Sequence, residues 1–177
     1  MPLYVISGGP GAGKTTLLTA LQQVGFGTAD EVSRQLIREQ VALGTDQVPW
    51  RNLAGFAELA LARMVAQHQA ASQANRTTFF DRGIPDVIGY MLVAGLSVPP
   101  AYYTAAATHP YASPVLLAPP WAEIYVNDAE RWQTFGEAQA LYHALRRTYQ
   151  DLGFTVLDLP KVPVVERVAF VRKVVAT

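Results

Sequence analysis

The residues whose types and spacing point most directly to chemistry are the eight from Gly8 to Thr15, which read Gly-Gly-Pro-Gly-Ala-Gly-Lys-Thr. They match the pattern G-x-x-x-x-G-K-[ST], in which the backbone N–H groups of a glycine-rich loop surround nucleotide phosphates. Glycines let such a loop curl and leave no Cβ in the way of the phosphate. The residues expected to bind nucleotide are Gly8, Gly9, Pro10, Gly11, Ala12, Gly13, Lys14, Thr15 and Thr16.

Two side chains of this loop would add charge and metal chemistry to the backbone donors. Lys14 is expected to place its ammonium group against the β- and γ-phosphates, and the Thr15 hydroxyl is expected to hold Mg²⁺. The free N–H groups and the positive dipole end of a following helix would favour the same anion.

The segments around the loop fit the arrangement that the pattern requires. Residues 3–7 (Leu-Tyr-Val-Ile-Ser) form a short apolar run typical of a buried strand. Residues 16–21 carry leucines at helical spacing directly after the loop. A strand, a phosphate loop and a helix are therefore expected in succession.

A second acidic site is expected at the end of another strand. Residues 77–81 (Thr-Thr-Phe-Phe-Asp) indicate a buried strand whose last residue, Asp81, would position Mg²⁺ directly or through water. The alternative is that Asp81 only caps a turn before Gly83. The next residue is Arg82 rather than the water-polarising Glu of many hydrolytic ATPases, and Arg82 would supply a second cation near the phosphates.

The remaining segments alternate between strand and helix patterns, which predicts a parallel sheet covered on both faces, a three-layer α/β/α fold with five strands. Further strands are expected within residues 25–30, 114–118 and 154–159, and helices at about 31–43, 52–75, 86–95, 101–108, 137–152 and 163–175. Ligands of such sheets bind beyond the carboxyl ends of the strands, so the phosphate loop, Glu31, Asp81 and Trp121 should border one crevice.

Bulk properties narrow the class of protein. A chain of 177 residues favours one domain spanning residues 1–177. With 14 basic and 14 acidic residues and no basic cluster, neither a nucleic-acid partner nor a membrane partner is expected. Cysteine is absent, which excludes disulfides and thiolate chemistry. The start of the chain resembles no signal peptide, and no apolar run could span a bilayer, so a cytoplasmic protein is expected.

Several stretches in order along the chain resemble the P-loop group of AAA-type ATPases and kinases that includes the ribosylnicotinamide kinase domain. The matching segments are residues 6–16 (Ile-Ser-Gly-Gly-Pro-Gly-Ala-Gly-Lys-Thr-Thr), 80–86 (Phe-Asp-Arg-Gly-Ile-Pro-Asp), 119–121 (Pro-Pro-Trp), 128–131 (Asp-Ala-Glu-Arg) and 153–154 (Gly-Phe). The resemblance implies a nucleoside- or nucleotide-kinase-like fold that uses ATP and Mg²⁺, with a lid at about residues 121–135.

The resemblance also implies roles for individual side chains. Glu31 would accept the proton of an acceptor hydroxyl, Arg34 and Asp86 would contact the acceptor, and Arg131 would reach the phosphates from the lid. Each role has an alternative. Glu31 and Arg34 have the spacing of a surface ion pair, Asp86 stands where a carboxylate favours a helix dipole, and Arg131 fits a solvated charged helix.

These expectations favour ATP- and Mg²⁺-dependent phosphoryl transfer to a small-molecule acceptor, with Lys14, Glu31, Asp81, Arg82 and Arg131 as the catalytic set. Two alternatives stay open: a stand-alone ATPase, and a nucleotide-dependent regulatory module that acts on a protein partner. GTP is less favoured because the chain has no Asn-Lys-x-Asp motif. The acceptor and the oligomeric state are not readable from the sequence.

Overall fold

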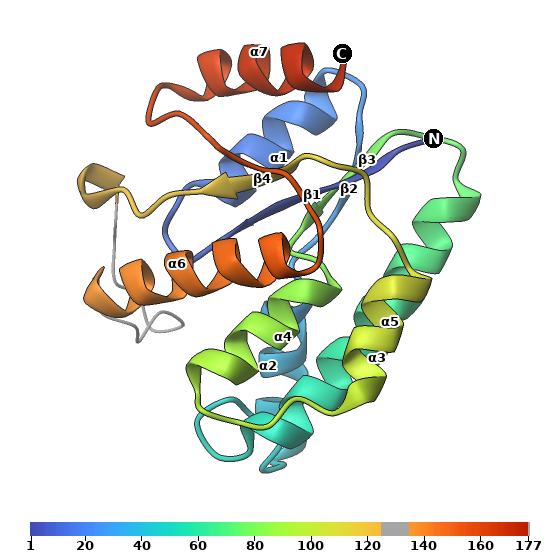
Figure 1. Cartoon of the computed structure of the whole chain (residues 1–177), viewed down its shortest axis with the longest axis vertical. Helices are drawn as coiled ribbons and strands as arrows, with labels where there is room; N and C mark the ends of the chain where they lie inside the picture. Colours follow the sequence, from blue (N-terminus) through green and yellow to red (C-terminus); the bar gives the residue numbers. More distant parts are fainter. Residues whose placement is uncertain (125–134, 177) are drawn as a thin grey trace.

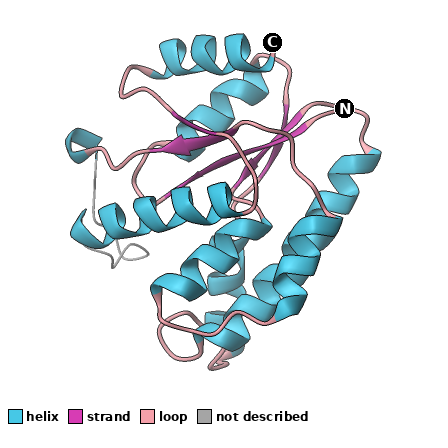
Figure 2. Ribbon diagram, viewed as in Figure 1, coloured by secondary structure: helices cyan, strands magenta, loops and turns pink. Residues whose placement is uncertain are grey.

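The computed structural model of the chain describes residues 1–124 and 135–176. Its centre is a parallel sheet of five strands in the order β2-β3-β1-β4-β5 (Figures 1 and 2). The strands are β1 (Leu3–Gly8), β2 (Gly27–Ala29), β3 (Thr78–Asp81), β4 (Val115–Ala118) and β5 (Val156–Asp158). All strand pairs are parallel, as the alternation of strand and helix patterns predicts.

Helices cover both faces of this sheet, so the predicted three-layer arrangement is confirmed (Figure 1). Two helices, α1 (Lys14–Gln23) and α7 (Val164–Val175), pack together on one face. The other face carries α2 (Val32–Leu43), α3 (Leu53–Gln73), α4 (Ile84–Val93), α5 (Pro100–Thr108) and α6 (Phe135–Asp151).

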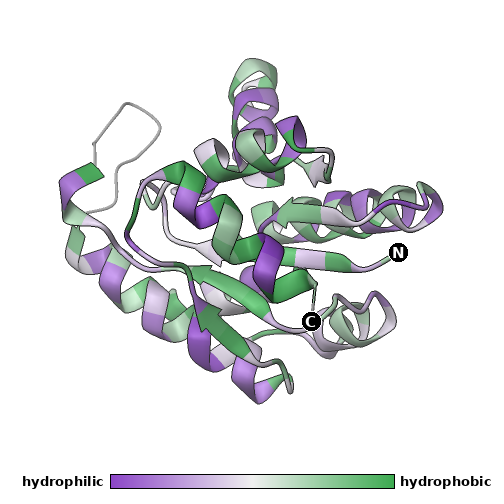
Figure 3. Ribbon diagram, turned by 90° about the horizontal axis from the view of Figure 1, so that it is seen from above, coloured by the Kyte–Doolittle hydropathy of each residue, from purple (hydrophilic) through white to green (hydrophobic). Residues whose placement is uncertain are grey.

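The alternation of side chains along β1 builds a separate core on each face of the sheet. Leu3 and Val5 belong to a buried cluster formed with α2, α3, α4 and α5. Tyr4 and Ile6 belong to a second cluster formed with α1 and α7. Because successive strand residues point to opposite faces, a central strand with two buried faces reads as an unbroken apolar run. Figure 3 shows these strands as apolar bands between helices of mixed polarity.

The register of the sheet brings the carboxyl ends of its central strands to one edge. Ile6 of β1 lies opposite Asp81 of β3 and Leu116 of β4. Gly8, which ends β1, has a φ of 131°, and a Cβ there would lie 2.5 Å from the carbonyl oxygen of Ala118. A glycine is therefore required where β1 passes β4 and enters the phosphate loop.

Helix α4 begins at Ile84, two residues before the position expected from the sequence. The expectation placed Pro85 outside the helix, but proline fits the first turn because the N–H group that it lacks would have no partner there. Gly89 lets α4 approach α6 closely, since a Cβ at Gly89 would lie 2.8 Å from Leu145.

The predicted lid falls mostly outside the described residues. Residues 125–134, which include Arg131, are not described, and the flanking segments are a short 3₁₀ turn (Ala122–Ile124) and the start of α6 at Phe135. Within residues 1–124 and 135–176, no helix combines the length and the apolar character needed to cross a bilayer.

Candidate active site

The segment from Gly9 to Gly13 forms a loop between β1 and α1, in which Gly11 and Gly13 have left-handed backbone angles. Lys14 starts α1 and is almost completely buried. Its Nζ atom donates a hydrogen bond to the carbonyl oxygen of Gly9 over 2.8 Å, so the side chain folds back over the loop. This geometry holds the ammonium group against the loop, beside the N-terminus of α1, where a phosphate would be favoured.

Asp81, at the end of β3, lies next to this ammonium group. Its Oδ1 atom is 3.9 Å from Nζ of Lys14 and is buried without a hydrogen-bond partner among the described residues. Burial raises the pKa of Asp81, against the opposing charges of Lys14 and Arg82. Burial likewise lowers the pKa of Lys14, and the charge of Arg82 lowers it further. An unpartnered buried carboxylate oxygen is costly, and a cation or a water molecule would satisfy it.

The donors near Asp81 fit Mg²⁺. The exposed side chain of Thr15 borders the same cavity as the loop, and a hydroxyl and a carboxylate are hard oxygen ligands. Within residues 1–124 and 135–176, no group of three or more His, Asp or Glu side chains is arranged so that it could hold a metal ion by itself. A metal bound here would therefore take most of its ligands from water and phosphate, as Mg²⁺ usually does.

Glu31 and Arg82 meet although they are 51 positions apart in sequence. Arg82 follows β3 with a φ of 69°, unusual for a residue with a side chain, and its guanidinium forms an ion pair with Glu31 at the start of α2. Arg34 lies 3.6 Å from the other Glu31 oxygen. Burial alone would raise the pKa of Glu31, but the charges of Arg82, Lys14 and Arg34 outweigh burial and lower that pKa to about 2.

Asp86 borders the site but its carboxylate is already occupied. Oδ1 accepts a hydrogen bond from the Ser7 hydroxyl over 2.6 Å, and Oδ2 accepts bonds from the Gly83 N–H over 2.8 Å and from the Tyr149 hydroxyl. Burial raises the pKa of Asp86. These contacts join β1, α4 and α6, so the structure gives Asp86 a supporting position behind the predicted acceptor contacts.

Arg167 on α7 is a site residue that the sequence did not reveal. Its Nη1 atom donates to the carbonyl oxygens of Ala12 and Gly13 over 3.3 and 3.5 Å. Its guanidinium also lies 5.7 Å from the centre of the Trp121 ring. Arg167 therefore joins the phosphate loop to the segment after β4. No motif marks it, because a basic residue on an amphipathic helix is common.

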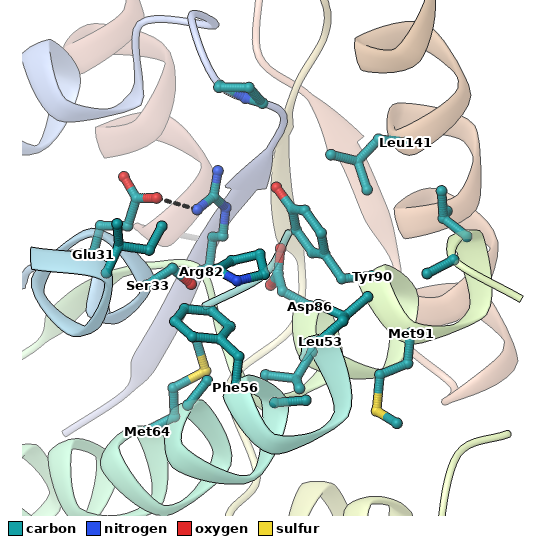
Figure 4. Close-up of a pocket in the computed structure, with 18 of the residues that line it drawn as sticks. Glu31, Ser33, Leu53, Phe56, Met64, Arg82, Asp86, Tyr90, Met91 and Leu141 are labelled. Carbon is teal, nitrogen blue, oxygen red and sulfur yellow. Dashed lines mark hydrogen bonds and ion pairs between the residues drawn. The ribbon is translucent and has the colours of Figure 1, made fainter. Parts of the chain in front are cut away.

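Two cavities meet at this edge of the sheet. One, of about 450 Å³, runs along the phosphate loop past Trp121, Ile124 and residues 162–164. The other, of about 330 Å³, lies between α2, α3, α4 and α6 and is bordered by Arg82, Asp86 and Tyr90 (Figure 4). Pro10 and Glu31 line both cavities.

A parallel sheet with a strand that runs through this glycine-rich loop into a helix is the arrangement of the P-loop nucleotide-binding proteins. Within that class, a family described as an AAA domain matches residues 3–167, and the chain belongs to this family. A comparison with curated proteins found no match.

Solved kinases share the fold at low sequence identity. NadR, solved in complex with NR, has a TM-score of 0.73 and 19% identity, over 98% of this chain and 50% of NadR. Deoxyadenosine kinase from M. mycoides has a TM-score of 0.66 and 14% identity, over 99% of each chain. Thymidylate kinase from Ehrlichia chaffeensis has a TM-score of 0.59 and 15% identity, over 99% of this chain and 98% of the kinase. The NadR likeness and the family match confirm the resemblance to the ribosylnicotinamide kinase group.

Proposed function

We propose that this protein transfers the γ-phosphoryl group of ATP, with Mg²⁺, to a hydroxyl group of a small-molecule acceptor. The observation that carries the proposal is the junction of the two cavities at Pro10 and Glu31. A donor lying along the phosphate loop and an acceptor lying in the second cavity would meet at that junction. A hydrolytic ATPase needs only the first cavity, so a second cavity that shares Pro10 and Glu31 with it favours transfer to an acceptor.

On the donor side, the triphosphate of ATP would lie on residues 8–16 with Lys14 over its β- and γ-phosphates. Thr15 and Asp81 would hold Mg²⁺, Asp81 mostly through water. The metal would neutralise charge on the β- and γ-phosphates during transfer. The purine would lie against the Trp121 ring, which borders this cavity beside Arg167.

On the acceptor side, Glu31 would accept a hydrogen bond from the hydroxyl and orient its oxygen toward the γ-phosphorus. That oxygen forms the new P–O bond, the bond to the β-phosphate oxygen breaks, and the hydroxyl proton leaves through Glu31. A pKa of about 2 makes Glu31 a weak base, which suits a loose transition state that needs positioning and charge neutralisation more than early proton removal. Arg82 would provide positive charge beside the moving group, and Arg131 stays a prediction outside the described residues.

Product analysis tests the proposal. The protein is incubated with ATP, Mg²⁺ and a panel of hydroxyl compounds, and mass spectrometry detects phosphate esters. We expect an ester with at least one acceptor, and a fall of about 10²–10³-fold in the Lys14→Met variant, which loses the cation over the phosphates. Lys173→Met on α7 is the matched control, because Lys173 borders neither cavity. Hydrolysis of ATP without an ester, or nucleotide binding without turnover, would contradict phosphoryl transfer to an acceptor.

A further inference from the structure

The walls of the 330 Å³ cavity are apolar over most of their extent. Leu53, Phe56 and Met64 of α3 lie on one side, Met91 of α4 lies opposite, and Leu141 of α6 lies above them (Figure 4). These side chains come from three helices, yet none brings a hydrogen-bonding group to its part of the wall. A cavity of this volume lies at the small end of the range of about 300–1,000 Å³ that is usual for ligand sites.

The polar side chains gather at the end that faces the phosphate loop. Glu31, Ser33 and Arg82 lie together there, and the Tyr90 ring lies beneath the Arg82 guanidinium at 5.4 Å (Figure 4). Arg82 already forms an ion pair with Glu31, so the two charges offset each other within the site. Asp86, Tyr90 and Glu137 also line the cavity, so its polar groups come from α2, α4, α6 and the end of β3, and the rest of its lining is apolar.

The edge of a nucleobase or the hydroxyls of a sugar would be poorly matched to this remainder. Buried polar groups require hydrogen-bond partners, and the α3 side of the cavity, with Leu53, Phe56 and Met64, offers none from its side chains. A phosphate-bearing acceptor requires cations in fork-like pairs with its oxygens. Arg82 is engaged by Glu31, and Asp86 on the same wall brings no positive charge that could bind a phosphate.

We infer that the acceptor is an uncharged alcohol whose body beyond the reacting hydroxyl is mostly hydrocarbon, such as a terpenoid or aryl-substituted alcohol. The inference rests on the proposed function, since it names the acceptor class of that site. The hydroxyl lies between Glu31 and the phosphate loop, and the hydrocarbon body lies among Phe56, Met64 and Met91. Removal of this apolar surface from water provides the binding free energy.

Competition between acceptor classes tests this inference. Geraniol, cinnamyl alcohol, thymidine, thymidine monophosphate and glucose are each supplied with ATP and Mg²⁺, and each phosphate ester is quantified by mass spectrometry. We expect kcat/KM for geraniol or cinnamyl alcohol to exceed that for each polar compound by about tenfold or more. A higher kcat/KM for thymidine, its monophosphate or glucose than for geraniol and cinnamyl alcohol would overturn this inference, while it would support phosphoryl transfer. Release of inorganic phosphate without any ester would count against both.

A matched pair of substitutions locates the binding of the alcohol. Leu53, half-buried in the cavity wall, is changed to Gln, and Leu43, 72% exposed at the end of α2, receives the same change as the control. Leu53→Gln should raise the KM for the preferred alcohol about tenfold and leave the KM for ATP unchanged, because the added amide lies in the apolar part of the cavity. An equal KM for the alcohol in Leu53→Gln and Leu43→Gln would overturn the inference. Ile37→Gln, at another half-buried wall position, replaces Leu53→Gln if that variant fails to fold.

Discussion

The guanidinium of Arg82 and the carboxylate of Glu31 form an ion pair between the end of β3 and the start of α2. Arg82 reaches this position with a left-handed backbone angle, a conformation that costs about 1–3 kcal/mol in a residue other than glycine. Its side chain is 5% exposed and its Nε atom has no partner among the described residues. A strained backbone and an incompletely satisfied buried cation are features of sites built for a ligand, here at the junction of the two cavities.

Glu31→Gln should lower kcat by about 10²-fold, within the range that a positioned acid–base group contributes. The amide cannot take the proton of the acceptor, and Arg82 loses the charge that offsets its own. Initial rates with saturating ATP and varied acceptor measure the effect. Glu39→Gln is the control, because Glu39 pairs with Arg63 on the surface and borders neither cavity. Equal losses in the two variants would remove Glu31 from the site.

The dependence of folding stability on pH should differ between the wild type and Glu31→Gln. The folded-state pKa of Glu31 is about 2, below its ordinary value of 4.5. The ionised form is therefore stabilised by folding, and this contribution is complete above pH 4.5 and is lost as pH falls toward 2. Urea unfolding at several pH values should show a steeper loss for the wild type in that window. If the free energy of unfolding depends on pH in the same way in both proteins, the cationic neighbours of Glu31 do not stabilise its ionised form in the folded state.

Arg167→Met should weaken ATP binding by about tenfold, which is about 1.4 kcal/mol. The variant loses the donors to Ala12 and Gly13 and the cation beside Trp121, so the loop is no longer fixed from α7. Calorimetric titration with a non-hydrolysable ATP analogue measures the change. Arg172→Met, exposed on the same helix, should bind as the wild type does. Identical affinities for the two variants would show that the contact from α7 does not order the loop.

Asp86→Asn should destabilise the fold by about 1–3 kcal/mol, the usual penalty for an unsatisfied buried polar group. The amide nitrogen cannot accept a hydrogen bond, so donors from Ser7, Gly83 or Tyr149 would lose their acceptor. Chemical denaturation measures the change in free energy of unfolding. Asp151→Asn at the exposed end of α6 should stay within about 0.5 kcal/mol of the wild type. If Asp86→Asn is as stable as the wild type but inactive, the result would support the direct contact between Asp86 and the acceptor that the family resemblance implies.

The sequence predicted those features that a short run of consecutive residues is enough to identify. The loop from Gly8 to Thr15 could be read because its spacing is imposed by phosphate geometry, and Asp81 because it ends an apolar run. Glu31 could be placed near the site because residues after parallel strands share one edge of the sheet. The spacing in the sequence suggested an ion pair of Glu31 with Arg34. The ion pair of Glu31 with Arg82 could be seen only in the three-dimensional structure.

What the sequence could not predict depends on contacts between distant segments. Arg167 lies 154 positions from Gly13, and no local pattern marks such a pairing. Asp86 stands where any helix favours a carboxylate, so its bonds to Ser7 and Tyr149 are visible only once β1, α4 and α6 are assembled. The cavity among α2, α3, α4 and α6 is likewise a product of packing, although its apolar residues are ordinary core residues one by one.

The position of β1 at the centre of the sheet determines when the protein can first bind a nucleotide. β1 pairs with β3 and β4, and neither of these strands precedes Thr78 in the chain. The loop therefore leaves the ribosome before β3 and β4 do, and until then the strand that supports it lacks both of its neighbours. Such long-range pairing slows folding, since the chain between the strands must first be closed into a loop. Nascent chains that end before Thr78 should therefore be unable to retain ATP, while in the complete protein the nucleotide would stabilise the folded state by mass action.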